Sequence, residues 1–358
     1  MKHSTNVPAG RLTTALLASG QMRATSLVLF TCVFASCALA AEKPLEIFFI
    51  DVEGGQATLF VTPEHRSLLI DTGWGYNAYR DAKRIAAAAK LADIKRIDLV
   101  LITHYHADHV GGVPQLVAKL PVGTFIDHGP NRENTNSVNH LVSGYQAAID
   151  GSNHVIAKPG EHLPLKGLDA VVVSADGNLV DQPLPGAGQP NQFCSGVPQK
   201  GADATENARS VGTVLTFGRL RIVDLGDLTW DKELELVCPN NKLGRADIFV
   251  VSHHGMDLSN SPALVHALAP RVAIFDNGSK KGAAASAWDV VKSSPGLEDI
   301  WQLHFADANG QEHNVSDPFI ANVTEADTGY YLKITAHQDG SFEVFNPRNK
   351  YSKSYPAK

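Results

Sequence analysis

The sequence lacks two features that would assign it to a common functional class at once. It has no interior stretch that reaches the roughly 18–20 unbroken apolar residues of a membrane span, so the fold is expected to be soluble. It also lacks an excess of positive charge. Residues 1–40 carry 3 of the 31 basic residues and none of the 37 acidic ones, which leaves 31 − 3 = 28 basic against 37 acidic residues in the remainder, a net charge of −9. This balance argues against broad binding to nucleic-acid backbones, because such binding depends on basic patches. A small-molecule substrate is the expected partner, and the sequence does not indicate an oligomeric state.

The N-terminal segment has the composition of a targeting signal. The apolar run "SLVLFTCVFASCALA" (26–40) follows Arg23 and ends in a small-residue site before Ala41. Residues 1–40 are therefore predicted to be a signal peptide, with Met22 as an alternative start. An uncleaved membrane anchor is the competing interpretation. The prediction is an exported protein, periplasmic or secreted.

Cysteine is scarce, and two of the four cysteines fall inside the predicted signal. Cys194 and Cys238 remain, each beside turn-like sequence. In an exported chain these two residues are expected to pair as a disulfide. Two unpaired cysteines are the alternative.

The rest of the chain alternates between strand-like and helix-like segments with no Pro/Ser-rich linker, which predicts one domain over 42–358. Short apolar runs of strand length are followed by segments with helical spacing, as in 67–73 and 78–92. This order predicts an α/β fold whose sheets are covered by helices. The pattern breaks at 177–209, a Gly-, Pro- and Asn-rich segment predicted to be an irregular loop at the rim of the pocket.

The strongest chemical signal is "THYHADHVGG", which begins directly after the apolar run 96–102. Three histidines and one aspartate occupy the six positions 104–109, namely His104, His106, Asp108 and His109. Alternate residues of an extended segment project to the same side, so these side chains are expected to converge. Imidazole and carboxylate are the ligands of open catalytic metal sites, whereas structural zinc sites favour thiolates. The cluster is therefore predicted to bind metal.

Two later segments repeat the same arrangement of an apolar strand followed by ligand-type residues. "RIVDLGD" ends in Asp227, and "IFVVSHHG" ends in His253 and His254. Ligands of open α/β sheets gather at the carboxyl ends of the strands. We therefore expect Asp227 to bridge two ions and the histidine pair to complete the site.

With these residues in view, the chain resembles the metallo-β-lactamase-fold hydrolases. The similarity lies in the H-x-H-x-D-H signature at 104–109, in "LLIDTG" before it, and in "LGD" and "SHHG" after it. "DVEGGQATLF" (51–60) is most similar to the branch that contains the nuclease-like domain of DNA-uptake competence proteins and phosphorylcholine esterase. The resemblance implies an αββα sandwich with a binuclear metal site at the edge of the two sheets.

The resemblance also implies roles for individual residues. His104 and His106 would hold the first metal, Asp108 and His109 the second, and Asp227 both. His254 is favoured over His253 as the remaining ligand of the second metal, and the other histidine would contact substrate. Asp108, His253 and His254 are the residues expected to take part in catalysis. The metals are expected to be zinc, with manganese or iron as alternatives.

Three further residues are predicted to support the site or contact substrate. Asp71 of "LLIDTG" would orient the histidine loop. Asn207 occupies the place where many members of the family supply a third histidine to the first metal. His128 is a candidate to replace that ligand. Asp51 and His304 are weaker candidates for the same surroundings.

A binuclear site of this kind predicts hydrolysis. A metal-bound hydroxide would attack a phosphodiester or phosphomonoester, and the second ion would neutralise the leaving group. A carboxylic ester, a lactone or another acyl substrate is the alternative chemistry on the same site. A non-catalytic metal- or ligand-binding protein is the alternative from a different class.

Overall fold

The computed structural model describes residue 15, residues 43–324 and residues 327–358, and the predicted signal peptide lies almost entirely outside them. Residues 42–358 form one compact unit, separate from residues 1–41. Within the described part of the chain, no helix combines the length and the apolar character needed to cross a membrane. The signal peptide predicted at residues 1–40 stays a prediction.

The unit contains two mixed β-sheets. The strands and helices of its first half are β1 (Leu45–Phe49), β2 (Thr58–Val61), β3 (Ser67–Ile70), α1 (Arg80–Leu91), β4 (Ile97–Leu101), α2 (Ala107–Val110), α3 (Val113–Val117), β5 (Val122–Asp127), α4 (Asn136–Ile149) and β6 (Asn153–Ile156). The second half contains β7 (Asp169–Ala175), β8 (Asn178–Leu179), β9 (Gly212–Phe217), β10 (Leu220–Asp224), α5 (Trp230–Val237), β11 (Ile248–Val250), α6 (Pro262–Leu268), β12 (Val272–Phe275), α7 (Ala285–Lys292), β13 (Asp299–His304), β14 (Ile320–Asn322), β15 (Leu332–Ala336), β16 (Phe342–Asn346) and β17 (Tyr351–Tyr355).

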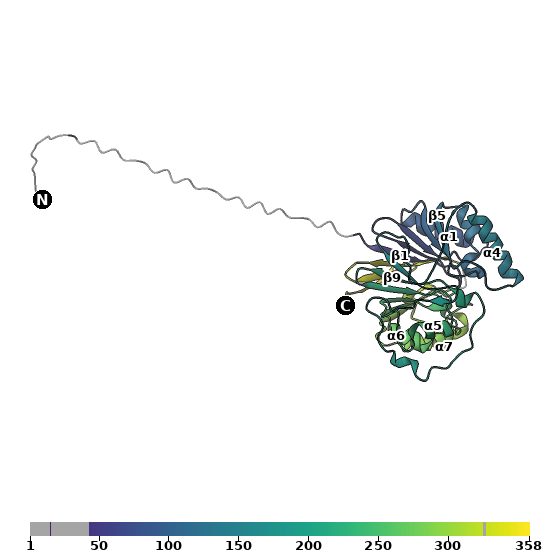
Figure 1. Cartoon of the computed structure of the whole chain (residues 1–358). Helices are drawn as coiled ribbons and strands as arrows, with labels where there is room; N and C mark the ends of the chain where they lie inside the picture. Colours follow the sequence, from purple (N-terminus) through teal and green to yellow (C-terminus); the bar gives the residue numbers. More distant parts are fainter. Residues whose placement is uncertain (1–14, 16–42, 325–326) are drawn as a thin grey trace, which may run out of the picture. The chain divides into compact units, whose positions relative to one another are not determined.

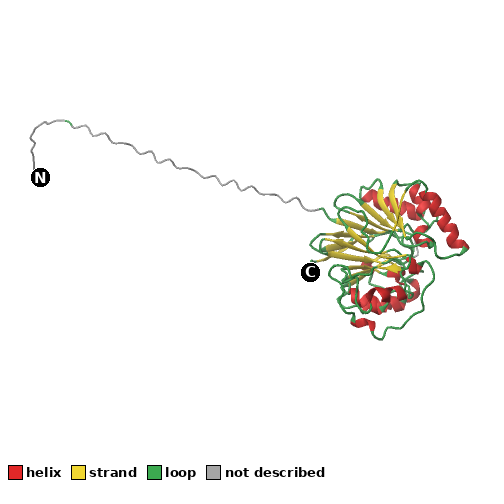
Figure 2. Ribbon diagram, viewed as in Figure 1, coloured by secondary structure: helices red, strands yellow, loops and turns green. Residues whose placement is uncertain are grey.

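The last three strands return to the first sheet. Its order is β17-β16-β15-β1-β2-β3-β4-β5-β6, and the order of the second sheet is β14-β13-β12-β11-β10-β9-β7-β8. Figure 1 shows α1 and α4 on the outer face of one sheet and α5, α6 and α7 on the outer face of the other. The strands in Figure 2 therefore lie as two central layers between two layers of helices. This is the αββα sandwich that the sequence predicts.

Alternation along the strands explains the layers. In β3, Leu68 and Ile70 pack in the core between the sheets, whereas Leu69 packs against the helices on the outer face. Successive side chains of a strand point to opposite faces, so a strand that is apolar throughout can serve both cores. Short continuous apolar runs therefore suit strands that are covered on both sides.

Strand direction determines where polar side chains gather. β3, β4 and β5 are parallel to one another, as are β10, β11, β12 and β13. The carboxyl ends of each parallel set lie at one edge of its sheet, and that edge is where open α/β sheets bind ligands. The residues that follow these strands include Asp71, His104, Asp227, His253 and Asp276.

Segment 177–209 is irregular apart from β8 and two short 3₁₀ turns, Gln192–Cys194 and Asn207–Arg209. A disulfide joins Cys194 to Cys238 at the end of α5, with 5.8 Å between the Cα atoms. The disulfide ties the middle of this segment to a helix of the outer layer. The expected pairing of the two cysteines is therefore present in the fold.

Candidate metal centre

Four buried side chains form the larger of two groups of possible metal ligands among the described residues. Asp108, His109, Asp227 and His254 each present one ligand atom, and these atoms lie within 4.8 Å of one another. His254 Nε2 is 3.1 Å from Asp108 Oδ2 and 3.2 Å from His109 Nε2. His109 Nε2 is 3.3 Å from Asp227 Oδ2. The chain thus brings together residues up to 146 positions apart.

A second pair of imidazoles lies beside this group. His104 Nε2 and His106 Nδ1 face each other at 3.1 Å, and Asp227 Oδ2 is 3.8 Å from His104 Nε2. His253 Nε2 is 3.3 Å from the same carboxylate oxygen. The carboxylate of Asp227 therefore lies between the two groups, as expected for a residue that bridges two cations.

The backbone holds the histidine loop against the strand ends. Thr72 donates both its backbone N–H and its hydroxyl to the carbonyl of His109, each at 2.8 Å. His253 and His254 both adopt positive φ angles of 55°, a left-handed conformation that is unfavourable for residues other than glycine. Such strain is found mainly at functional sites, and here it accompanies two adjacent imidazoles that both reach Asp227.

The ring nitrogen of His109 that faces away from the cluster has a carboxylate partner. Asp71 Oδ2 lies 2.7 Å from His109 Nδ1, and Asp71 also accepts hydrogen bonds from the backbone N–H and hydroxyl of Thr103. A carboxylate at Nδ1 keeps the proton on that atom and leaves the Nε2 lone pair directed into the cluster. Asp71 thus has the geometry of the orienting residue that the sequence predicts.

Two other histidines have similar acidic partners that the sequence analysis does not identify. Glu133 Oε2 lies 3.1 Å from His106 Nε2, which leaves Nδ1 directed toward His104. Asp276 Oδ1 lies 3.3 Å from His254 Nδ1. Asp276 could have been found, because it follows the apolar run 272–275 as Asp227 follows its own strand. Glu133 lies in a polar loop, and nothing in the sequence marks it.

The charges and pKa values of the buried carboxylates and imidazoles suit a cation among them. Burial would raise the pKa of Asp227, but the charges of His109 and His253 outweigh burial and hold this pKa well below its usual range. Burial would lower the pKa of His109, but Asp227 and Asp108 outweigh it and raise this pKa. Asp227 Oδ1 and His254 Nδ1 are buried and make no hydrogen bond within the described residues. Ionised carboxylates, inward-facing imidazoles and unpaired buried atoms are a donor set suited to divalent cations.

The remaining predicted residues lie in other contacts. His128 Nε2 is 2.7 Å from Glu206 Oε2, so this ring nitrogen is already engaged. Asn207 is buried and its Oδ1 makes no hydrogen bond among the described residues. Asp51 and His304 pair with each other at 2.7 Å. The roles predicted for these residues in metal or substrate binding stay predictions.

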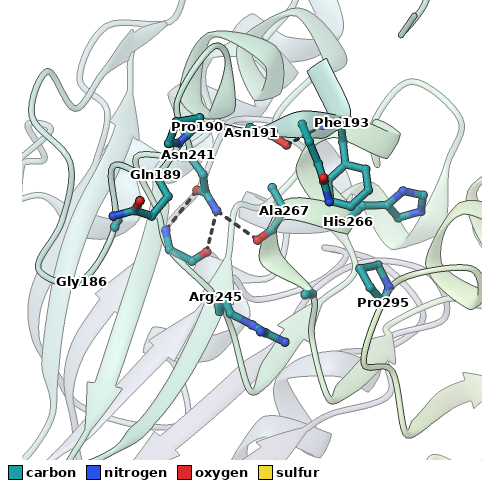
Figure 3. A pocket seen from close by; sticks show the side chains of 14 residues that line it. Gly186, Gln189, Pro190, Asn191, Phe193, Asn241, Arg245, His266, Ala267 and Pro295 are labelled. Atoms are coloured by element: carbon teal, nitrogen blue, oxygen red, sulfur yellow. Dashed lines mark hydrogen bonds between the residues drawn. The ribbon is translucent and has the colours of Figure 1, made fainter. Parts of the chain in front are cut away.

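A hollow of the described surface lies away from these residues. A cavity of about 480 Å³ lies beside the disulfide, lined in part by Phe193, Arg245 and His266 (Figure 3). Asn241 lies on its wall, and its amide is used fully by backbone groups, including the carbonyls of Gly244 and Ala267. No group of metal-ligand type converges on this cavity, so we place the candidate chemistry at the strand ends.

Comparison with known proteins agrees with this placement. Residues 51–188 match the model of the metallo-beta-lactamase superfamily, and this range includes the cluster at 104–109. A hydroxyacylglutathione hydrolase of Shewanella loihica is 37% identical over 76 residues, which cover 19% of this chain and 27% of that protein. An atrochrysone carboxyl ACP thioesterase of Aspergillus chevalieri is 42% identical over 67 residues, which cover 19% of this chain and 21% of that protein.

The similarity to these curated relatives is local, because the chain spans about a quarter of the length of the first of them. Among solved structures, the metallo-beta-lactamase fold protein YhfI of Bacillus subtilis is 13% identical. The match covers 73% of this chain and 96% of that one, with a TM-score of 0.43.

Proposed function

We propose that this chain, whose residues 51–188 match the model of the metallo-beta-lactamase superfamily, is a binuclear metal-dependent hydrolase that cleaves phosphoesters. The observation that carries the proposal is the position of Asp227. Its Oδ2 is 3.3 Å from His109 Nε2 and 3.8 Å from His104 Nε2, so one carboxylate serves both groups of imidazoles. A carboxylate shared in this way is the geometry that a two-metal site requires.

The donor atoms divide into two sets around Asp227. His104 Nε2 and His106 Nδ1 would hold the first cation, and Asp108, His109 and His254 the second. Of the His253–His254 pair, His254 is the ligand, because its Nε2 lies against both Asp108 and His109. His253 is 8% exposed, whereas His254 is fully buried. His253 is therefore the histidine that can contact substrate.

Two divalent cations at this site would supply Lewis acidity and lower the pKa of a water molecule between them. The chain's own residues position the reaction. Asp71 and Glu133 fix the rings of His109 and His106 by bonding their outer nitrogens, and Asp276 lies 3.3 Å from the outer nitrogen of His254. His253 lies beside Asp227 at the mouth of the site, where it can donate a proton to a leaving oxygen. The few protein ligands of the first cation leave positions open for phosphate oxygens.

Zinc is the proposed metal, with manganese or iron as alternatives, since imidazole and carboxylate ligands suit all three. We also propose that the protein is exported to the periplasm or the medium. The Cys194–Cys238 disulfide supports export, because disulfides persist mainly in oxidising compartments. The substrate is proposed to be a small molecule, because the net charge of −9 after residue 40 (28 − 37) disfavours nucleic acid.

A second candidate function is the hydrolysis of an acyl ester, thioester or lactone at the same site. Two relatives with local similarity to this chain favour this candidate, because one is named a hydroxyacylglutathione hydrolase and the other an acyl carrier protein thioesterase. Attack at a carbonyl carbon needs the same two cations and the same histidine at the mouth. The two candidates differ in the pocket around the metals rather than in the metal ligands.

The test is metal analysis of the purified protein, followed by assays on phosphodiester, phosphomonoester, acyl ester, thioester and lactone panels. We expect two metals per chain and hydrolysis of phosphoesters. Asp227→Ala should lose metal from both positions and reduce turnover by roughly 100-fold or more, because it removes the shared ligand. Asp257→Ala is the matched control, since Asp257 is exposed and should keep both metals.

Three results would change the proposal. Activity on acyl substrates alone would select the second candidate. Activity on β-lactams alone would overturn both. A metal-free protein that binds a small ligand equally well with and without Asp227→Ala would indicate a non-catalytic binding protein.

A further inference from the structure

One cation of the chain itself reaches the candidate metal centre. The ammonium group of Lys281 contacts Asp108 Oδ2, the oxygen that also faces His254 Nε2. Lys281 lies in the loop after β12, 173 residues from Asp108 in the sequence. Its side chain is 32% exposed, whereas that of Asp108 is 8% exposed. The ammonium group therefore lies at the boundary between the buried ligands and the solvent.

The base of the Lys281 side chain is fixed, whereas its end is not. Gly278 donates its backbone N–H to the carbonyl of Lys281 at 2.9 Å. A Cβ atom added at Gly54 would come within 2.9 Å of Lys281 Cβ, so the two backbones approach each other closely. Beyond this anchored base, four flexible carbons carry a compact charge with three donors. The ring of Trp74 lies 5.2 Å from Nζ, which is cation–π range.

A divalent cation held by Asp108 would change the surroundings of this lysine. The carboxylate would then neutralise the metal, and the like charges of the metal and the ammonium group would repel each other. Lys281 would lose its counter-ion while its base stayed fixed beside the site.

We propose that Lys281 binds an anionic oxygen of the substrate, a phosphate or carboxylate oxygen, at the mouth of the metal centre next to Asp108. This inference rests on the proposed hydrolase function and deepens it, because it assigns an anionic substrate class to the site. Lys281 is a substrate-binding residue in this proposal, and Trp74 is a positioning residue that keeps the ammonium group at the mouth. The net negative charge of the chain makes such a local cation important, since it provides an attraction that the rest of the surface does not.

The first experiment measures binding and needs no turnover. Inorganic phosphate is titrated into the metal-loaded full chain by calorimetry, with metal content determined for every variant. Lys281→Met should weaken phosphate binding by roughly tenfold or more, the loss expected for one charged hydrogen bond. Lys281→Arg should keep most of the affinity. Lys280→Met is the matched control, because Lys280 is the adjacent lysine and is exposed, and it should bind like the wild type.

The second experiment compares two 4-nitrophenyl esters, the neutral acetate and the anionic hemisuccinate. Lys281→Met should raise KM roughly tenfold for the hemisuccinate and leave KM for the acetate unchanged. A carboxylate effect without a phosphate effect would limit the site to carboxylates, and the reverse would limit it to phosphates. If neither ester is cleaved, the second candidate function, acyl hydrolysis, fails, and the phosphate titration still tests Lys281.

Three outcomes would overturn the inference. Lys281→Met could bind phosphate like the wild type, with an unchanged KM for the hemisuccinate. Lys280→Met could lose as much affinity as Lys281→Met, which would indicate general surface charge. Lys281→Met could bind the second metal more tightly with unchanged phosphate affinity, in which case Lys281 is only a counter-ion of Asp108.

Discussion

Replacing Asp71 by asparagine should weaken the binding of the second metal without disturbing the backbone. Asp71 has a φ angle of 59°, and asparagine tolerates this left-handed conformation better than most residues. The side chain is fully buried, and its size barely changes. In the wild type, the backbone N–H of Thr103 donates a hydrogen bond to Asp71 at 2.8 Å, and the amide oxygen of asparagine can still accept it. The hydroxyl of Thr103 can rotate to accept instead of donate.

The contact with His109 cannot adjust in this way. Asp71 Oδ2 lies 2.7 Å from His109 Nδ1, where a carboxylate accepts a proton and an amide nitrogen would donate one. The proton of the imidazole must then move to Nε2, the atom that faces Asp108 and Asp227. Loss of such an orienting carboxylate costs roughly 10- to 100-fold in metal affinity, or about 1.4–2.7 kcal/mol.

The assay is competition for zinc against a chromophoric chelator, with metal stoichiometry measured in parallel. Asp276→Asn is the matched comparison. Asp276 Oδ1 is 3.3 Å from His254 Nδ1 and forms no hydrogen bond with it, so this variant should lose less affinity than Asp71→Asn. Asp71→Asn protein that binds zinc as tightly as the wild type would refute the reasoning. So would a larger loss in Asp276→Asn.

Two further predictions concern stability. Burial raises the pKa of Glu233 to about 7, although the backbone N–H groups of Ser261 and Asn260 lower it in part. Because the folded protein favours the protonated form of Glu233, this residue contributes to the free energy of unfolding. The contribution is complete below pH 4.5 and is lost as the pH rises through 7. It amounts to about 3 kcal/mol, so in urea titrations at pH 5 and pH 8 Glu233→Gln should lose less stability with rising pH than the wild type; equal losses would contradict this. Removing the disulfide with Cys194→Ser/Cys238→Ser should lower the free energy of unfolding by about 4 kcal/mol, since the bond closes a loop with a sequence separation of 44. Dithiothreitol should destabilise the wild type but not this variant, and a wild type unaffected by reduction would count against it.

The sequence alone predicts the strand ends at which the candidate metal centre lies. Each ligand-type residue of the cluster follows a short apolar run, and such runs become strands buried on both faces. Parallel strands place their carboxyl ends at one edge, so the pattern around His104, Asp227 and His254 predicts the convergence of these residues, whereas the αββα sandwich is implied by the resemblance to the metallo-β-lactamase-fold hydrolases. The hairpin turns at Gly218 and Gly340 have equally local causes, because both residues adopt positive φ angles that glycine tolerates.

Tertiary structure alone decided what each ligand contacts besides its neighbours in the cluster. His128 follows a strand as His104 does, yet its Nε2 is paired with Glu206. Glu133 and Lys281 carry no motif, but they contact His106 and Asp108 across 27 and 173 residues. The physical reason is that periodicity and turn chemistry are local, whereas the partner of a polar group depends on which loops meet at the sheet edge. The sequence therefore determines the candidate metal ligands as a class, and the packing of the loops determines their orientation and the charge at the mouth of the site.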